Sequence, residues 1–125
     1  MDKVLQQIIK KAKNDPDILA VALFGSYLKK KLYNDIDICI FLVPKKYDEL
    51  IISKKKLEYT PHQEKYDVQI FQQLPLYIRK RILKEAKILY QRNEDDLYDL
   101  YYSTIQQYAL FEPIYEDYLK EVAHG

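Results

Sequence analysis

The sequence has almost no cysteine or glycine and no tryptophan. Among its 125 residues there are one Cys, two Gly and no Trp. A single cysteine excludes a disulfide framework and a multi-cysteine zinc site, and it fits a reducing compartment. The chain also lacks an apolar run of the roughly 20 residues that span a bilayer, and its first residues lack the charged-then-apolar plan of a signal peptide. We therefore expect one cytoplasmic domain over residues 1–125 that does not bind a membrane.

The scarcity of glycine makes Gly25 informative. The other glycine, Gly125, is the last residue, so Gly25 is the only one inside the chain. Glycine adopts a positive φ at no steric cost, which other residues rarely do. A chain with so little glycine is expected to keep it where the backbone needs a special conformation. At Gly25 we therefore expect such a conformation.

Charge is divided unevenly along the chain, although the net charge is only +1. Residues 1–92 hold 19 of the 20 Lys and Arg residues and 11 of the 19 acidic residues, which gives this basic body a charge of +8. Residues 93–125 hold one Lys and eight acids, which gives −7. A basic body can attract a polyanion such as a nucleotide. The same pattern also fits two parts that neutralise each other, or ordinary solvated faces, so charge alone leaves the question open.

Hydrophobic periodicity predicts alternating helices and strands. Helices are expected over residues 2–13, 46–56, 74–86 and from 94 onward, and strands over 18–24, 35–43, 67–71 and 87–91. In the helix over 46–56, the side chains of Tyr47, Leu50 and Ile51 are expected to point inward. Asn93 is expected to cap the last, acidic helix, and Pro113 to kink or interrupt it.

Two aspartates alternate at the start of the second predicted strand. Because strand side chains alternate, Asp35 and Asp37 project from the same face, about 6.5–7 Å apart along the strand. Their face continues with apolar residues, where unpaired carboxylates are costly. A divalent cation would compensate them, and Mg²⁺ prefers oxygen ligands and bridges to substrate phosphates. If the third predicted strand lies beside the second, Asp67 joins the pair, and three carboxylates suit two metal ions about 3.5–4 Å apart.

Gly25-Ser26 follows the first predicted strand at what should be a strand-to-helix turn. Gly25 would let the backbone approach a phosphate, while the Ser26 hydroxyl and the next N–H groups could donate hydrogen bonds to it. Each feature alone has an ordinary explanation, because many strands end in Gly-Ser and most Asp-x-Asp pairs are turn or surface acids. Asp67 alone could simply open a strand. In combination and in this order, however, the features predict a nucleotidyl-transfer site.

These residues resemble a known signature. Gly25-Ser26 followed by Asp35-Ile36-Asp37 is similar to the motif of the DNA polymerase β nucleotidyltransferase superfamily, and Asp67 matches its third carboxylate. The later part of the chain, with its basic helix and its acidic, tyrosine-rich helix, resembles the minimal nucleotidyltransferase (MNT) antitoxins of MNT/HEPN toxin–antitoxin pairs. The likeness covers about residues 2–122.

The resemblance implies a polymerase-β-like α+β fold, a small mixed β-sheet flanked by helices with a long C-terminal helical segment. It also implies an antitoxin that uses ATP and Mg²⁺ to attach AMP to a tyrosine of a HEPN ribonuclease toxin, with no direct binding of nucleic acid. Gly25, Ser26 and Lys29 would then bind the triphosphate. The catalytic and metal-binding residues would be Asp35, Asp37 and Asp67, and Asp67 would help to deprotonate the tyrosine hydroxyl.

The sequence departs from the family pattern between Ser26 and Asp35, where the segment is shorter than usual and lacks the family's Arg. Lys29–Lys31 could neutralise phosphate in place of that Arg, or could be a solvated run. Two other functions stay open: transfer of a nucleotide to a small molecule or an RNA end, and neutralisation of a partner by binding alone. A last set of residues fits structural roles, with the tyrosines also fitting a partner surface: Cys39, His62, His124, Tyr98, Tyr101, Tyr102 and Tyr108.

Overall fold

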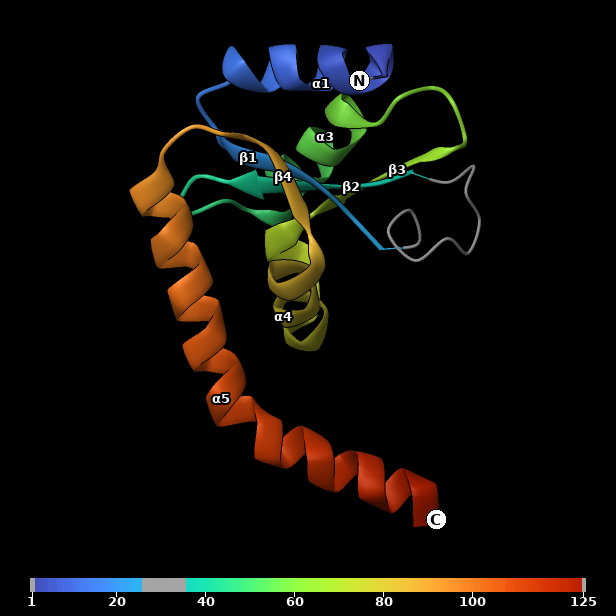
Figure 1. Cartoon of the computed structure of the whole chain (residues 1–125), viewed down its shortest axis with the longest axis vertical. Helices are drawn as coiled ribbons and strands as arrows, with labels where there is room; N and C mark the ends of the chain where they lie inside the picture. The colour runs from blue at the N-terminus through green and yellow to red at the C-terminus, as the bar shows by residue number, and fades with distance from the viewer. Residues whose placement is uncertain (1, 26–35, 125) are drawn as a thin grey trace.

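The computed structural model describes residues 2–25 and 36–124, which form a four-stranded sheet with helices on both faces (Figure 1). The strands are β1 (Ile18–Phe24), β2 (Ile36–Leu42), β3 (Tyr66–Ile70) and β4 (Lys87–Gln91), in the spatial order β3-β2-β1-β4. β1 runs antiparallel to β2 and β4, whereas β2 and β3 are parallel. The sheet is therefore mixed, and the C-terminal end of β1 meets the N-terminal ends of β2 and β3.

One face of the sheet is covered by α1 (Lys3–Lys13) and α3 (Glu49–Tyr59). Asp2 begins α1 because its carboxylate accepts hydrogen bonds from the N–H groups of Val4 (2.7 Å) and Leu5 (3.2 Å), which have no partner within the helix. The core beneath the two helices consists mainly of aliphatic side chains from alternate strand positions: Ile18, Val21, Leu23, Ile38, Ile40, Leu42, Val68 and Ile70.

α3 turns a different face inward from the one that the sequence predicted. Leu50 is 64% exposed and Ile51 is 42% exposed, whereas Ile52 and Tyr59 pack against the core. The prediction for Leu50 and Ile51 is wrong because it assumed that apolar side chains alone would face the sheet. The position between Ile52 and Tyr59 on the inward face belongs to Lys55, whose side chain is only 14% exposed.

Lys55 can be buried because it meets two carboxylates just before β1. Its Nζ lies 2.6 Å from Asp15 Oδ2 and 3.3 Å from Asp17 Oδ2, and the Tyr59 hydroxyl donates a hydrogen bond to the same Asp15 oxygen (2.9 Å). Burial by itself would raise the pKa of Asp15, but the hydrogen bonds from Lys55, the Asp17 N–H and Tyr59 hold that pKa below its ordinary value. The guanidinium of Arg92 donates to four backbone carbonyls nearby, at residues 12, 13, 15 and 18. These contacts fasten α1, α3 and the chain leading into α5 at one end of the sheet.

The other face is covered by α4 (Leu76–Glu85) and α5 (Glu94–His124), with a 3-10 turn, η1 (Phe71–Gln73), leading from β3. Phe41 of β2 stacks on Phe71, with ring centroids 4.6 Å apart, in a core that also contains Cys39. β1 contributes two successive residues, Leu19 and Ala20, to this layer because its register with β2 shifts at that point, as in a β-bulge.

α5 is a continuous helix of 31 residues. Asn93 caps it as predicted, since its side-chain oxygen accepts a hydrogen bond from the Asp96 N–H (3.1 Å). Pro113 lies inside the helix and does not end it, and the axis bends on the way to the C-terminus (Figure 1). A proline cannot donate to the carbonyl one turn earlier, which explains a bend without a break. No helix within the described part of the chain is long and apolar enough to cross a membrane.

Candidate functional site

Two of the predicted carboxylates lie side by side at one end of the sheet. Asp37 is the second residue of β2 and Asp67 is the second residue of β3, and the parallel register pairs them directly. Paired residues on neighbouring strands project from the same face, so the two side chains share one side of the sheet. The sequence predicted that Asp67 joins the aspartate pair if the third predicted strand lies beside the second. In the structure β3 does lie beside β2. Asp37 is half-buried and Asp67 is exposed, so solvent and ligands can reach the pair.

The turn at Gly25 reaches the same point from the end of β1. Phe24, the last residue of β1, pairs with Asp37, and Gly25 follows with a φ of 75°. This confirms the special backbone conformation that the scarcity of glycine predicted, because residues with a side chain rarely adopt a positive φ. The geometry adds a second reason for glycine. A Cβ at this position would lie 2.5 Å from Asp37 Oδ2, so the Asp37 carboxylate occupies the space of any side chain.

Sequence reasoning missed Gln69, which is a neighbour of Asp67. Both side chains lie on the same face of β3, two residues apart, and the Gln69 amide nitrogen lies 3.4 and 3.3 Å from the two carboxylate oxygens of Asp67. Lys56 of α3 in turn donates to the Gln69 amide oxygen (3.3 Å). This chain of hydrogen bonds limits how the Asp67 carboxylate can rotate. The sequence signal for this contact was that Gln69 lies two residues after Asp67 in a predicted strand. Many ordinary strand residues have the same spacing, so it did not single out Gln69.

Three predicted site residues, Ser26, Lys29 and Asp35, lie outside the described residues, and their positions stay predictions. Among residues 2–25 and 36–124 there is no group of three His, Cys, Asp or Glu side chains placed to hold a metal ion. The donor set that is described, two adjacent carboxylates at an exposed sheet end, suits a hard divalent cation such as Mg²⁺. Asp35, two residues before Asp37 in the sequence, stays the predicted third carboxylate of the set.

The remaining titratable candidates take no part in this arrangement. Cys39 is fully buried two residues along β2 from Asp37, and burial raises the pKa of its thiol, which keeps the thiol protonated and unreactive. His62 is exposed in the segment between α3 and β3. The structural interpretation of Cys39 in the sequence is thus consistent with its place in the core.

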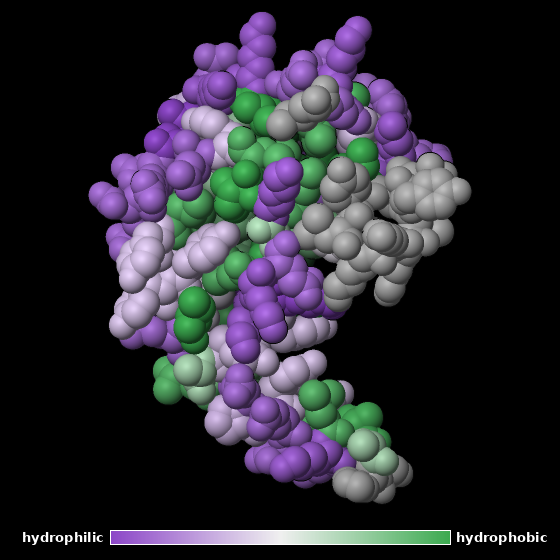
Figure 2. All heavy atoms as spheres, in the orientation of Figure 1, coloured by the Kyte–Doolittle hydropathy of each residue, from purple (hydrophilic) through white to green (hydrophobic). Residues whose placement is uncertain are grey.

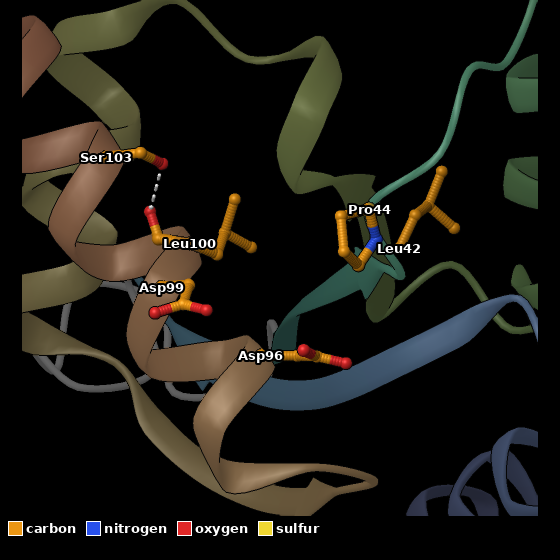
Figure 3. A pocket seen from close by; sticks show the side chains of 6 residues that line it. All are labelled: Leu42, Pro44, Asp96, Asp99, Leu100 and Ser103. Carbon is orange, nitrogen blue, oxygen red and sulfur yellow. Dashed lines mark hydrogen bonds between the residues drawn. The ribbon is translucent and has the colours of Figure 1, made fainter.

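A separate pocket lies at the opposite end of β2 (Figure 3). It has a volume of about 310 Å³ and lies between the end of β2 and the first turns of α5. Leu42, Pro44 and Leu100 provide its apolar walls, and Asp96 and Asp99 stand on the helix side. None of the three predicted site residues that the structure describes, Gly25, Asp37 and Asp67, lines it, so the carboxylate pair is a surface site at the sheet end and not part of this pocket.

Comparison with protein families gives a match over most of the chain. Residues 6–95 match the family described as "Polymerase beta, Nucleotidyltransferase". A protein of Methanocaldococcus jannaschii that is provisionally named a protein adenylyltransferase is 35% identical over 75 residues. The aligned part makes up 58% of this chain and 56% of that protein, so the chain spans little more than half the length of this relative.

Solved structures share the fold over nearly the whole chain. A chain from a toxin–antitoxin complex with AMP-PNP superposes with a TM-score of 0.70 at 18% identity, covering 97% of each chain. A chain from a complex of tri-AMPylated Shewanella oneidensis HEPN toxin with MNT antitoxin gives a TM-score of 0.68 at 19% identity, covering 98% of this chain and 99% of that one. At such identities the likeness establishes the fold, and the predicted polymerase-β-like α+β fold is confirmed.

Proposed function

The chain belongs to the polymerase β nucleotidyltransferase family, and on this premise we propose that it is an antitoxin that transfers AMP from ATP to a tyrosine of a HEPN-type toxin. The observation that carries the proposal is the alignment of Asp37 with Asp67 beside the Gly25 turn. This arrangement brings two carboxylates next to a turn whose glycine carries no side chain. The names of the related proteins support the acceptor, since they include a protein adenylyltransferase and a complex with an AMPylated toxin. The use of ATP supports action in the cytoplasm.

In the proposed reaction the chain's residues mainly position charge. The Gly25 turn, with Ser26 and Lys29 beyond it, would hold the triphosphate, and Asp35, Asp37 and Asp67 would hold Mg²⁺. When bound, Mg²⁺ would neutralise phosphate charge and favour loss of the proton from the attacking hydroxyl. The tyrosine oxygen attacks the α-phosphorus in line, the bond from that phosphorus to the oxygen bridging to the β-phosphate breaks, and pyrophosphate leaves.

The proton of the acceptor tyrosine needs a base, because a phenol has a pKa of about 10. We propose that a carboxylate oxygen of Asp67 accepts it, which suits the exposure of Asp67 and its orientation by Gln69. Asp37 lies against the Gly25 turn, where it would face the phosphates held by that turn.

The experiment is a transfer assay with ATP labelled at the α-phosphate, Mg²⁺ and a purified HEPN-type toxin as the acceptor. Label is expected on that protein, and Asp37→Asn or Asp67→Asn is expected to lower the rate at least a hundredfold, because each removes a charge needed at the reacting phosphate. Glu64→Gln is the matched control, since Glu64 is exposed in the segment just before β3 but lies outside the carboxylate pair.

Two results would contradict the proposal. The first is toxin inhibition that survives both Asp37→Asn and Asp67→Asn with no transfer of label, which would mean neutralisation by binding. The second is label found on RNA or on a small molecule and not on protein.

A further inference from the structure

α5 carries an apolar stripe along its whole length. Its members recur at alternating spacings of four and three residues, which places them on one face of a helix. They are Leu97, Tyr101, Thr104, Tyr108, Phe111, Tyr115, Tyr118 and Val122. Such a stripe normally packs against another element along its whole length. The residues that pack on each part of the stripe therefore show what that part of the helix contacts.

The first part of the stripe is covered by this chain. Leu97 and Thr104 are buried, and Leu97 packs in the core beneath α4 and α5 with residues of the sheet. Further along, α5 packs on α4: Tyr115 stacks on Tyr77 with ring centroids 5.3 Å apart, and Glu112 lies 3.8 Å from Lys80 Nζ. α5 is therefore anchored to the fold as far as Tyr115.

The last turns of α5 have no such cover. Residues 116–123 are all exposed, with Tyr118 and Val122 of the stripe at 61% and 60%. The tail leads away from the sheet in Figure 1, and Figure 2 shows apolar side chains gathered on it. A helical segment of this length is marginal by itself in water. An apolar surface that continues a packed stripe is therefore expected to be completed by a partner.

We propose that the tail stripe, defined as Ile114, Tyr118, Leu119 and Val122, is the surface on which the acceptor protein docks. This inference rests on the proposed function. Ile114 and Leu119, 69% and 45% exposed, flank the line from Tyr118 to Val122 and widen it. A helix with so wide an apolar face fits a groove between helices of its partner.

Charge determines which groove fits. Three acids, Glu116, Asp117 and Glu121, surround the tail stripe, with Lys120 as the one basic residue of the segment. The partner groove should therefore be apolar and rimmed by Lys and Arg. Two α5 tails lying side by side would bring like charges together, and an anionic membrane surface would repel the segment.

The basic body of a second copy has the right charge but a poorer shape. Its exposed apolar side chains include Leu50 and Leu57, which both lie on the outer side of the single helix α3. They offer a ridge and not a groove. A second copy is therefore an outcome that the experiment has to separate from the acceptor.

The experiment compares two variants of the full chain that change the charge of the tail by the same amount. Y118E with V122E adds two negative charges on the stripe, and K120E changes the charge by the same two units on the opposite side of the helix. Binding of the purified HEPN-type acceptor is measured by titration calorimetry, together with AMP-PNP binding, the thermal midpoint and sedimentation. The double variant is expected to bind the acceptor at least tenfold more weakly and to raise the KM for it. Its kcat, its AMP-PNP affinity and its thermal midpoint should match those of the unmodified chain. K120E should weaken binding of the acceptor by less than twofold.

Several outcomes would overturn the inference. One is a double variant that binds the acceptor as well as the unmodified chain does. Another is an unmodified chain that sediments as a dimer while the double variant sediments as a monomer, because the stripe would then hold a second copy. The proposed function fails separately: if acceptor binding depends on the tail stripe but no AMP is transferred, docking stands and catalysis does not.

Discussion

At the scale of single residues, the fold has one internal glycine and places it against Asp37, one of the carboxylates that the proposed chemistry needs. Gly25→Ala would put a methyl group 2.5 Å from Asp37 Oδ2 and would force a residue with a side chain to a φ of 75°. The backbone strain is about 1–2 kcal/mol. The larger effect is expected on activity, because the Asp37 carboxylate has to move to make room.

Gly25→Ala is therefore expected to lower the free energy of unfolding by about 1–2 kcal/mol and to slow AMP transfer more than tenfold at a temperature where the variant is fully folded. Urea unfolding and the labelled-ATP assay measure the two effects. A loss of activity no larger than the loss of folded protein would show that Asp37 tolerates the displacement.

Gln69 offers a second test at this scale. Gln69→Leu keeps the size of the side chain but removes the amide that faces Asp67. Hydrogen bonds to a metal ligand orient it, and their loss typically costs about tenfold or more in metal affinity. We expect Mn²⁺ binding, followed by titration calorimetry in the presence of AMP-PNP, to weaken about tenfold.

Gln73→Leu is the control for Gln69→Leu, since Gln73 is an exposed glutamine in the turn after β3. Equal affinities for Gln69→Leu and Gln73→Leu would show that Asp67 does not depend on the amide for its orientation.

The site residues differ in how well the sequence predicted their positions. Side-chain alternation placed Asp37 on the face that continues with Cys39, and the order of the strands then placed Asp67 beside it. The contact between Gly25 and Asp37 was beyond sequence reasoning, because it depends on the register between β1 and β2 and on a side-chain position. Gln69 was missed because an amide near a carboxylate has no distinctive sequence pattern.

At the scale of elements, apolar periodicity worked where one face of an element meets the core. It gave the bounds of β1 and β4 and those of β2 and β3 to within one residue at each end. It failed for α3, which begins three residues later than predicted and turns Lys55 inward. A lysine on an inward face looks like an error in a pattern of apolar residues, and only the tertiary contacts with Asp15 and Asp17 account for it.

The Asp15–Lys55 contact predicts how stability depends on pH. The pKa of Asp15 is lowered in the fold, so its contribution is present above the unfolded pKa, near 3.9, and is lost as pH falls through the lower folded value. Asp15→Asn is expected to cost about 1–3 kcal/mol at neutral pH, since Lys55 and Tyr59 lose a charged acceptor. The difference from the unmodified chain should shrink as pH falls from about 5 to 3.

Thermal midpoints of the unmodified chain, Asp15→Asn and the exposed control Glu64→Gln, measured across this pH range, check the expectation. A difference between the first two that stays constant down to pH 3 would mean that the contact stabilises the fold without depending on the charge of Asp15.

At the scale of the whole molecule, the division of charge in the sequence becomes a division in space. The basic residues belong mostly to the sheet and the helices around it, whereas the acids of residues 93–125 all lie on α5. Glu112 of α5 meets Lys80, but the acids beyond it lie on the uncovered tail. The tail is thus not used to neutralise the body of its own chain. An acidic helix extending from a basic body can attract a basic protein and leave the sheet end free for ATP.

This division predicts how salt affects association with the acceptor. Complementary charge mainly raises the association rate, and salt screens charges that are more than about 8–10 Å apart. The association rate, measured by stopped flow, should therefore fall several-fold between about 50 and 500 mM NaCl while the dissociation rate changes little.

Neutralising the tail acids Glu116, Asp117 and Glu121 as Gln, Asn and Gln should slow association at low salt and flatten this dependence. Neutralising Glu94, Asp95 and Asp99, in the first turns of α5, as Gln, Asn and Asn should change the salt dependence less. Those residues are far along the helix from the tail stripe. Equal effects of the two triple variants would mean that the charge of the whole helix, and not a groove seated on its tail, steers the acceptor.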